Sequence, residues 1–416
     1  MATNPYDVVV VGGGPAGMMA AGKAAALGKR VLLLEKNNRL GKKLRISGGG
    51  RCNITNAEED ERVLLRAYGK AEQFLYSIFS QFGNKDTFSF FESLNLPLVV
   101  QARKRAFPTT ERAPDVVRAL EQYLAKGGVT VLTGTPATKV VAGPDGIEGV
   151  VCGTERYSGS YYIFATGSIS HPETGSTGDG FGWLRSLGHS VVAPTPTIVP
   201  LKSKDKWPAL LPGTTLSNMK ITFFTEGKKA FSKTGALLFT HFGISGPVVL
   251  NCAGMVSDLL YEGVVTAQID TSPTEDIGAL DKRLLAAFDA HKNKALKNML
   301  KEVVEPGAAK AALVLMDQDL AGKKVHSITK EERMSLAKLL KALPLTIEGL
   351  MGFDRAVVAD GGVPLDEVDM RTMRSKKVPN LSIIGDLLHI TRPSGGYSLQ
   401  LCWSTGFVAG AHTEFE

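Results

Sequence analysis

The residues with the most evident chemical capacity lie in the run LGKKLRISGGGRCNITN, which spans 40–56. Three consecutive glycines at 48–50 are flanked by basic side chains and followed by a cysteine and an asparagine (Lys43, Arg45, Arg51, Cys52, Asn53). Glycine lets backbone N–H groups come close to a ligand, and lysine or arginine offsets negative charge on it. The run therefore predicts a loop that holds an anionic ligand.

The thiol of Cys52 is the side chain of this loop that could take part directly in redox chemistry. The other cysteines lie far away in the sequence (Cys152, Cys252, Cys402), and no C-x-x-C occurs. That spacing disfavours a disulfide scaffold, a zinc ribbon and a dithiol redox pair. We expect Cys52 to pack as a small residue and the thiols to stay free.

A second motif lies near the start of the chain, in DVVVVGGGPAGMMAAGKAAALGKRVLLLEK. It predicts a strand over 8–11, an Ala-rich helix, and a second strand over 31–34 that ends at Glu35. The sequence Gly12-x-Gly14-x-x-Gly17 stands between the first strand and the helix, which is the arrangement that binds a dinucleotide.

Each residue of this motif has a distinct expected role. Gly12 permits the tight turn, Gly14 lets a pyrophosphate reach the helix N-terminus, and Gly17 lets the helix and the strand pack closely. Glu35 should accept hydrogen bonds from the hydroxyls of the adenosine ribose.

A carboxylate and a second glycine pair favour FAD over NAD as the dinucleotide. In VPNLSIIGDLLHITRPSGGYSLQLCWSTGFVAGAH, a short strand over 381–384 ends at Gly385-Asp386, where two-dinucleotide-fold flavoproteins hold the ribityl chain. Gly395-Gly396 then opens an amphipathic helix over 398–411. Its free N–H groups and positive dipole end would face the flavin pyrimidine, where reduction places negative charge.

Other segments fit the same cofactor. YYIFATGS (161–168) predicts a strand that ends at Thr166-Gly167, where the chain passes the cofactor, and GGVTVLTGTPATKVV (127–141) predicts a strand, a turn near Ala137 at the adenine edge, and a strand. In the first loop, Gly48–Gly50 should approach the N5 and O4 edge of the flavin. Its basic side chains should neutralise phosphate or an anionic reduced flavin (Lys43, Arg45, Arg51).

Few acid or base groups are available for chemistry beside the flavin. His241 lies in FTHFGISGPVV, a strand that runs into a glycine-bounded helix start, and His389 and Arg392 precede the cofactor helix. Histidine transfers protons near neutral pH, and arginine can hold an anion by two parallel hydrogen bonds. A structural role stays open for all three. His171 and His189 look like loop residues without metal-ligand spacing, so we expect no metal site.

At 416 residues, with 44% hydrophobic residues, the chain is long enough for two or three domains. A net charge of +7 and a pI near 9.0 indicate a mildly basic surface, and no basic run with interleaved aromatics points to nucleic acid. Neither a secretory signal nor an apolar run of bilayer length is recognisable. We expect a cytoplasmic enzyme that acts on a small molecule, without a nucleic-acid or membrane partner, and leave the oligomeric state open.

Four motifs make the chain resemble one flavoprotein family. GKKLRISGGGRCNITN, FPTTERAPDVV, FTHFGISGPVVL and ADGGVPLDEVDMRTMRSKKVPNLSIIGD look like signatures of the NAD(P)/FAD-dependent oxidoreductases that include aminoacetone oxidase and a bile-acid 3-dehydro-4,6-reductase. By position, the resemblance implies FAD contacts at Gly14, Pro15, Ala16, Glu35, Lys36, Ser47, Gly48, Gly49, Gly50, Arg51, Cys52, Asn53, Ala137, Thr166, Gly167, Asp386, Gly396, Tyr397, Ser398 and Leu399.

The resemblance implies an α/β fold in three parts: a discontinuous Rossmann-like FAD-binding domain of the glutathione-reductase type (1–190 and 354–416), an inserted β-barrel (191–272 and 343–353) and a small helical domain (273–342). Periodicity supports this organisation. Short β-rich runs with Gly, Pro and Lys turns extend from 190 to 270, as in a barrel or a sandwich. Apolar residues at helical spacing follow from 275 to 342, and a strand is expected at 351–358.

The chain also departs from the family pattern around the second glycine pair. Asp386 replaces an expected Glu, His389 stands where an Asp is usual, and Ser398 replaces an Asn. Arg392 and Pro393 precede the glycines in TRPSGG. We expect FAD binding to survive these changes, whereas the substrate of a named member does not carry over.

The favoured activity is hydride transfer between flavin N5 and a small organic substrate. Because one G-x-G-x-x-G alone follows a strand and opens a helix, a separate NAD(P)H-binding domain is not expected, and NAD(P)H would act as a transient reductant. A reductase of an activated C=C bond is favoured. The alternatives are an amine or amino-ketone oxidase and, in another class, a non-catalytic flavin-binding interaction protein.

Overall fold

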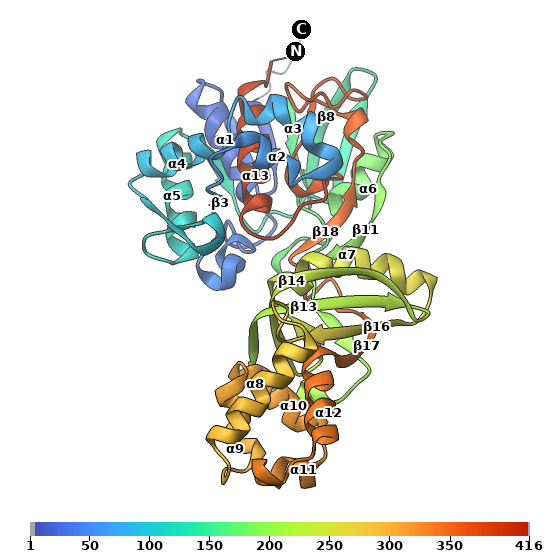
Figure 1. The fold of residues 1–416 in the computed structure, drawn as a ribbon. Helices are drawn as coiled ribbons and strands as arrows, with labels where there is room; N and C mark the ends of the chain where they lie inside the picture. Colours follow the sequence, from blue (N-terminus) through green and yellow to red (C-terminus); the bar gives the residue numbers. More distant parts are fainter. Residues whose placement is uncertain (1–4, 415–416) are drawn as a thin grey trace. The chain divides into compact units, whose positions relative to one another are not determined.

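The computed structural model describes residues 5–414, which form two compact units (Figure 1). The first unit consists of the chain up to Thr195 and from Val357 onward, and the second consists of Pro196–Ala356. The second unit is therefore an insertion into the first. The first contains a parallel α/β sheet and the second a closed barrel with helices, so the predicted fold class is confirmed.

A five-stranded sheet with the order β19-β10-β1-β2-β6 forms the centre of the first unit. All neighbouring strands run parallel, and Val10 pairs with Leu33 on one side and Ile163 on the other. Parallel sheets are covered on both faces, which explains why these strands are nearly continuous apolar runs. The strands are β1 (Tyr6–Val11), β2 (Val31–Leu34), β6 (Thr130–Leu132), β10 (Gly159–Phe164) and β19 (Leu381–Ile383).

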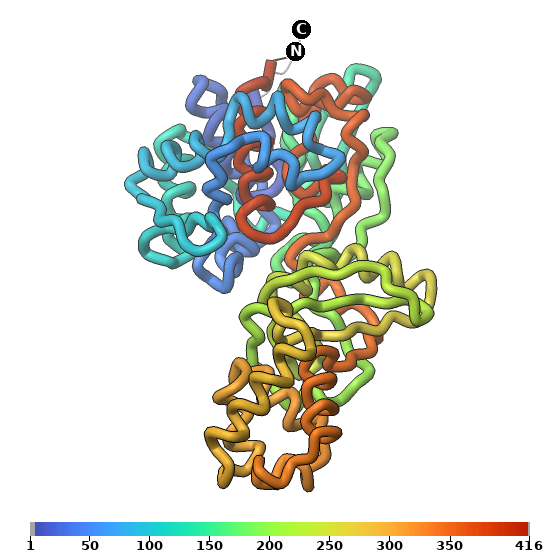
Figure 2. The backbone as a smooth tube through the Cα atoms, viewed as in Figure 1, coloured from blue at the N-terminus to red at the C-terminus, as the bar shows by residue number. Residues whose placement is uncertain are grey.

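Helix α1 (Pro15–Ala26) and helix α13 (Tyr397–Ala411) pack directly against each other, so the early and late parts of the chain share one core (Figure 1, Figure 2). Glycines on α13 permit this approach. A Cβ atom on Gly406 would lie 2.5 Å from the carbonyl oxygen of Ala16, and one on Gly410 would lie 2.4 Å from that of Ala20.

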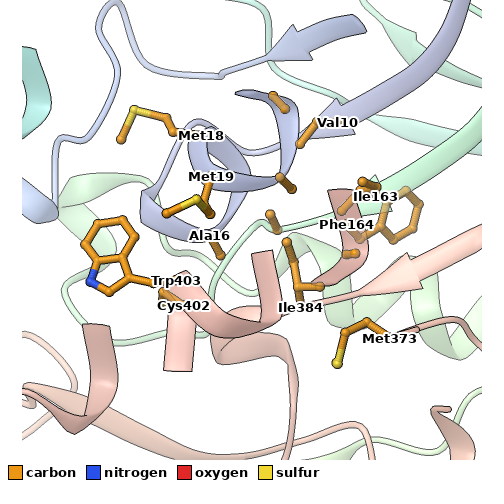
Figure 3. Packing of buried hydrophobic residues seen from close by; sticks show 14 of the residues in the cluster. Val10, Ala16, Met18, Met19, Ile163, Phe164, Met373, Ile384, Cys402 and Trp403 are labelled. Atoms are coloured by element: carbon orange, nitrogen blue, oxygen red, sulfur yellow. The ribbon is translucent and has the colours of Figure 1, made fainter. Parts of the chain in front are cut away.

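Helix α13 is buried on nearly every side, and the sequence-based prediction of an amphipathic helix was wrong in this respect. Its buried residues include Leu401, Trp403 and Val408. Figure 3 shows Cys402 and Trp403 close to Ala16 and Met19 of α1. The helix lies inside the unit, where α1, α3 (Glu72–Phe79) and α4 (Asn84–Ser93) cover it, and a helix enclosed in this way does not need a polar face.

The other elements of the first unit surround this core. Two antiparallel three-stranded sheets have the orders β3-β5-β4 and β7-β8-β9, and β11 pairs with β18. The remaining elements are α2 (Glu61–Arg66), α5 (Ala113–Lys126), α6 (Asp179–Ser186), β3 (Thr55–Asn56), β4 (Leu98–Gln101), β5 (Arg105–Pro108), β7 (Lys139–Gly143), β8 (Gly146–Cys152), β9 (Glu155–Tyr157), β11 (Val192–Thr197) and β18 (Val358–Gly362).

The second unit contains a closed barrel with the strand order β12-β15-β14-β13-β16-β17, and pairing of β12 with β17 closes it. Its elements are β12 (Leu201–Ser203), β13 (Thr215–Thr225), β14 (Lys228–Thr240), β15 (Gly243–Ser245), α7 (Pro247–Glu262), β16 (Val265–Asp270) and β17 (Leu343–Leu350). Helices α8 (Ile277–Ala290), α9 (Leu296–Val303), α10 (Pro306–Leu315), α11 (Gln318–Gly322) and α12 (Lys330–Lys341) lie between β16 and β17 in sequence and share one apolar core with the barrel.

The strand predicted at 351–358 was wrong. Strand β17 ends at Leu350, and β18 begins at Val358. A turn lies between them, in which the N–H of Arg355 donates to the carbonyl of Gly352. The apolar residues of this segment resembled a strand, but Gly352 and Asp354 favour a turn.

Candidate functional site

Two helix N-termini in the first unit are candidates for binding an anionic or electron-rich group. Helix α1 follows Gly14 and helix α13 follows Gly396, and neither glycine has a side chain that could cap its helix. The first N–H groups of a helix lack intrahelical acceptors and carry the positive end of its dipole. Both ends therefore present hydrogen-bond donors that a ligand can use.

The two N-termini point the same way and are offset along the helix axis. Ala16 contacts Gly406, and Ala20 contacts Gly410, so the two helices run in the same direction. Gly406 is nine residues beyond the start of α13, whereas Ala16 is one residue beyond the start of α1. A difference of eight residues places the two N-termini about 12 Å apart along the axis, at 1.5 Å per residue.

The glycines of the first turn divide into packing positions and open positions. Gly12 has a φ of 111°, and a Cβ there would lie 2.4 Å from the carbonyl oxygen of Ala165. A Cβ on Gly17 would lie 1.8 Å from the carbonyl oxygen of Gly12. In contrast, a Cβ on Gly14 would meet no atom of residues 5–414 within 4 Å. Gly14 thus leaves room for a ligand at the start of α1.

Glu35 lies at the end of β2 and is buried beside the glycine turn. Its carboxylate accepts from the N–H of Gly13 (2.7 Å) and from the N–H and side-chain amide of Asn37 (2.7 and 2.6 Å). The N–H of Thr135 donates to the Glu35 carbonyl, which places the turn before Ala137 next to this residue. Lys36 points elsewhere, because its ammonium binds Thr177 and Asp179, both at 2.6 Å.

The glycine-rich loop adopts the left-handed backbone that its sequence predicts. Gly48, Gly49 and Gly50 have φ values of 58°, 68° and 85°, and Cβ atoms on the last two would meet nothing within 4 Å among the described residues. They interrupt the 3-10 turns of the segment Leu44–Gly50, in which Ser47, Gly48 and Gly49 have non-helical backbone angles. The loop therefore exposes a stretch of backbone that no side chain covers.

Cys52 follows this loop as a buried residue with a φ of 62°. Burial raises the pKa of its thiol to about 12, and a hydrogen bond from Ser47 opposes this shift without reversing it. A thiol with this pKa stays protonated at neutral pH and is a poor nucleophile. Its environment is that of a packing residue.

The three basic side chains of the loop have different partners. Arg45 pairs with Glu121 (3.5 Å), and Arg51 pairs with Glu111 (3.1 Å) while lying over the ring of Phe107. Lys43 instead donates to Ser170 (2.7 Å) and lies 3.8 Å from the carboxylate of Asp386. The structure thus brings Lys43, and not the two arginines, next to another predicted site residue.

The loop is fixed to the start of α13. With its amide oxygen turned toward the helix, Asn53 accepts from the N–H of Gly396 (2.9 Å). A Cβ on Gly396 would lie 2.3 Å from the backbone of Thr55, whose hydroxyl donates to Gln400 (2.6 Å). Trp403 and Tyr397 add the bonds Trp403 Nε1 to Ile54 O and Tyr68 OH to Tyr397 O, each 2.9 Å. Residues more than 300 positions apart therefore form one rigid site.

Asp386 and Arg392 form an ion pair just before α13. Gly385–Leu387 forms a short 3-10 helix after β19, and the guanidinium of Arg392 bonds the carboxylate of Asp386. Because Arg392 is buried and its donors are engaged, it is not free to hold a substrate anion in this arrangement. His389 is half-buried, and its N–H donates to the carbonyl of Val363.

Two serines that the sequence analysis did not single out, Ser168 and Ser170, lie near the predicted site residues. Thr166 and Ser168 each carry a buried hydroxyl oxygen with no hydrogen-bond partner among residues 5–414, and Gly167 between them has a φ of 75°. Ser170, also buried, is the partner of Lys43. The run ATGSIS carried a usable signal, since hydroxyl residues at alternate positions after a buried parallel strand lie at the carboxyl edge of the sheet, where ligands bind.

His241 belongs to the second unit, whereas His389 and Arg392 belong to the first. It is exposed in the turn between β14 and β15. Helix α7 begins shortly afterwards, at Pro247, and its N-cap residue Gly246 has a φ of 95° and provides no side-chain cap. The imidazole and the helix N-terminus are thus close in sequence and available to a ligand.

Residues 5–414 contain neither a metal-binding cluster nor a membrane-spanning helix. No group of three or more His, Cys, Asp or Glu side chains there could hold a metal ion. In the same part of the chain, every helix is too short or too polar to cross a membrane.

The chain is similar to known proteins over nearly its whole length. The model of the HI0933-like protein Rossmann domain matches residues 6–412. The 3-dehydro-bile acid delta(4,6)-reductase of Clostridium scindens is 29% identical over 407 residues, which cover 96% of this chain and 97% of that protein. The ribosomal RNA dihydrouridine synthase of Escherichia coli is 27% identical over 407 residues, which cover 97% and 96%.

Among solved structures, the 3-ketosteroid-Δ4-(5α)-dehydrogenase of Rhodococcus jostii RHA1 has a TM-score of 0.55 to this chain at 15% identity, over 99% of this chain and 97% of that one. Likeness at this identity shows a shared fold. The resemblance inferred from the sequence motifs is confirmed by the family match. Since that match covers nearly the whole chain, the chain belongs to the HI0933-like Rossmann family, a family of flavoprotein oxidoreductases.

Proposed function

We propose that the chain binds FAD and reduces a C=C bond that is activated by conjugation to a carbonyl group, with NAD(P)H as the transient reductant. The observation that carries the cofactor assignment is the pair of parallel, uncapped helix N-termini of α1 and α13. Their offset of about 12 Å suits an extended ligand with a pyrophosphate at one end and an electron-accepting ring at the other.

The lining of this site supports the same ligand. Gly14, Gly49 and Gly50 leave open space where any other residue would place a Cβ. The buried hydroxyls of Thr166 and Ser168 have no protein partner among the described residues and can be satisfied by a polar ligand. Open backbone with unsatisfied polar groups is the environment that a large polar cofactor completes.

In this proposal each part of FAD has its own partners. Glu35 would accept from the adenosine ribose, the N-terminus of α1 would hold the pyrophosphate, and Asp386 would accept from the ribityl hydroxyls. The N–H groups at the start of α13 would hold the pyrimidine edge, and the backbone of Gly48–Gly50 would hold the N5 and O4 edge.

The substrate class rests on a chemical feature that two relatives share. A 3-dehydro-delta(4,6) bile acid carries C=C bonds conjugated to a ketone, and dihydrouridine arises from uridine by saturation of a C=C bond conjugated to a carbonyl. The two substrates differ in every other respect. We therefore infer the activated C=C bond and not the steroid or the RNA as the substrate feature of this chain.

When bound, FAD would accept hydride from NAD(P)H and deliver it to the substrate. The chain must then supply a proton to the neighbouring carbon and hold the substrate carbonyl. His389 in the first unit and His241 in the second are the candidate proton donors. The N–H groups at the uncapped N-terminus of α7 can donate hydrogen bonds to a carbonyl or carboxylate of a ligand.

Anaerobic mixing of the FAD-loaded protein with NADH and with NADPH tests the proposal. We expect rapid bleaching of the flavin band with at least one of them, and recovery of the band when a 3-oxo-4,6-diene steroid acid or a uridine-containing RNA is added. Bleaching by aminoacetone, with no bleaching by either nicotinamide, would instead establish an oxidase. A stable complex without turnover of any probe would favour the interaction protein.

The proton donor can be identified in the same assay. Replacement of the true donor, by His389→Asn or His241→Asn, should lower turnover by about 10²–10⁴-fold while leaving bleaching by NAD(P)H intact. His326→Asn is the matched control, because His326 is an exposed histidine that hydrogen bonds to the backbone of Lys292. If a variant also loses bleaching by NAD(P)H, the replaced histidine has a role in binding FAD or NAD(P)H instead.

A further inference from the structure

The carboxylate of Asp386 lies between two cations. The guanidinium of Arg392 bonds one carboxylate oxygen, and the ammonium of Lys43 lies 3.8 Å from the other. The Arg392 side chain is 1% exposed and those of Asp386 and Lys43 are 17% and 25% exposed. Water therefore screens these charges only weakly.

Arg392 makes three separate hydrogen bonds. Besides Asp386, it donates from Nη1 to the carbonyl of Ile390 (2.6 Å) and from Nε to the hydroxyl of Ser398 (3.1 Å). Ser398 lies in the first turn of α13. One side chain thus links the carboxylate after β19 to the uncapped N-terminus of the buried helix.

The cluster has a net charge of +1 when Lys43 is protonated, because two cations flank one anion. Burial lowers the pKa of Lys43, and the carboxylate of Asp386 opposes that shift. Arginine stays protonated in proteins, so Arg392 is the constant positive charge of the cluster. Its charge adds to the dipole of α13 at the same point.

We propose that Arg392 is a positioning residue that fixes Asp386 against the cofactor and keeps a positive charge beside the start of α13, and thereby raises the reduction potential of bound FAD. The inference rests on the proposed FAD function. It also reassigns Arg392, which the sequence suggested as a group for holding substrate. A reduced flavin carries more negative charge than an oxidised one, so a fixed positive charge nearby favours reduction.

Opposite charge changes give a sharp test in the full-length, FAD-loaded protein. Arg392→Met removes a positive charge, and Asp386→Asn removes a negative one. We expect the first variant to lower the midpoint potential of FAD, the second to raise it, and the double variant to return close to the wild-type value. The potential is measured by equilibration with reference dyes, which requires no substrate.

The positioning role has its own readout. FAD affinity, measured by titrating the apoprotein, should fall about tenfold in Arg392→Met, equivalent to about 1.4 kcal/mol. Arg392→Lys should keep the potential near the wild-type value while weakening binding, because lysine retains the charge but not the fork of donors.

Arg333→Met is the matched control, since Arg333 is a buried arginine paired with Asp281 (2.7 Å) in the second unit. Its loss should leave the potential of bound FAD unchanged. If Arg392→Met leaves the potential unchanged, or if both single variants shift it in the same direction, the inference is overturned. Failure of the wild-type protein to bind FAD would refute the proposed function itself, and the two failures are therefore distinct.

Discussion

Ala16 on α1 and Gly406 on α13 touch so closely that a Cβ on the glycine would lie 2.5 Å from the carbonyl oxygen of the alanine. This contact joins residues 390 positions apart and sets the offset between the two helix N-termini. The backbone of one helix is the neighbour of the other, so neither side can yield as a flexible side chain would.

Gly406→Ala should therefore destabilise the protein. We expect a loss of about 1–3 kcal/mol in the free energy of unfolding, typical of overpacking, measured by urea denaturation. Gly254→Ala is the matched control, because Gly254 also lies inside a helix but its Cβ would have an ordinary contact of 3.8 Å with Thr197. At position 254 the better helix propensity of alanine should raise the free energy of unfolding by about 0.5–1 kcal/mol. Equal effects at both positions would contradict the close helix contact.

Gly49→Val should abolish FAD binding. A valine would both strain the left-handed backbone and fill the open space above the loop, at a strain cost of about 1–2 kcal/mol. Gly128→Val is the control, since Gly128 has a φ of 69° against 68° for Gly49 and equally open surroundings among the described residues. Both variants should lose similar stability, but Gly49→Val alone should purify without FAD. Retention of stoichiometric FAD by Gly49→Val would show that this loop does not lie against the flavin.

The protein should lose stability as the pH falls below about 6.5, the ordinary pKa of histidine. His189 is buried between Glu367 (2.7 Å) and Ser375 (2.8 Å), and burial lowers its pKa. The unfolded chain then takes up the proton first, so acid favours unfolding. His189→Gln should flatten the pH dependence of the urea midpoint between pH 7 and the folded-state pKa of His189, while His326→Gln at the surface should not.

Glu367 should add a second loss of stability at lower pH. Hydrogen bonds from Lys377, Ser190 and His189 outweigh burial and hold the pKa of its carboxyl at about 2, against 4.5 ordinarily. Stability from this group is complete above the ordinary pKa and is lost as the pH falls from 4.5 through the folded value. Glu367→Gln should remove that acid-limb dependence. An unchanged slope in the denaturation data would show that the group is not held in its charged form.

The native protein should be inert to thiol reagents at pH 8. All four cysteines are free and buried, and burial raises the pKa of Cys52 to about 12 and that of Cys252 to about 11. Titration with a chromogenic disulfide should label none of them in the folded state and all four after denaturation. Rapid labelling of Cys52 in the native protein would revive a redox role for that thiol.

The sequence predicted the features that follow from backbone requirements. Gly12 and Gly17 occupy positions where a Cβ would collide with the chain, and Gly48–Gly50 adopt left-handed conformations, so their identities alone indicated the turn and the loop. Short β-rich runs likewise indicated a barrel or a sandwich, and the family resemblance implied the barrel that the structure has. Such patterns are local, and the fold class could be inferred from them.

What the sequence did not reveal depends on contacts between distant residues. Lys43, Arg45 and Arg51 looked equivalent, yet they differ because Glu121 and Glu111 happen to lie beside the two arginines. In the sequence, Arg392 also looked like an arginine that could hold a substrate anion, whereas in the structure it pairs with Asp386. Burial of α13 on nearly every side arises from its packing against α1, α3 and α4.

FAD binding is tested most simply by the stoichiometry of FAD in the purified protein after incubation with excess cofactor and removal of the unbound fraction. We predict one FAD per chain, with an absorption band at about 450 nm from the oxidised flavin. A protein that remains folded by circular dichroism, retains no FAD and shows no such band would contradict this prediction.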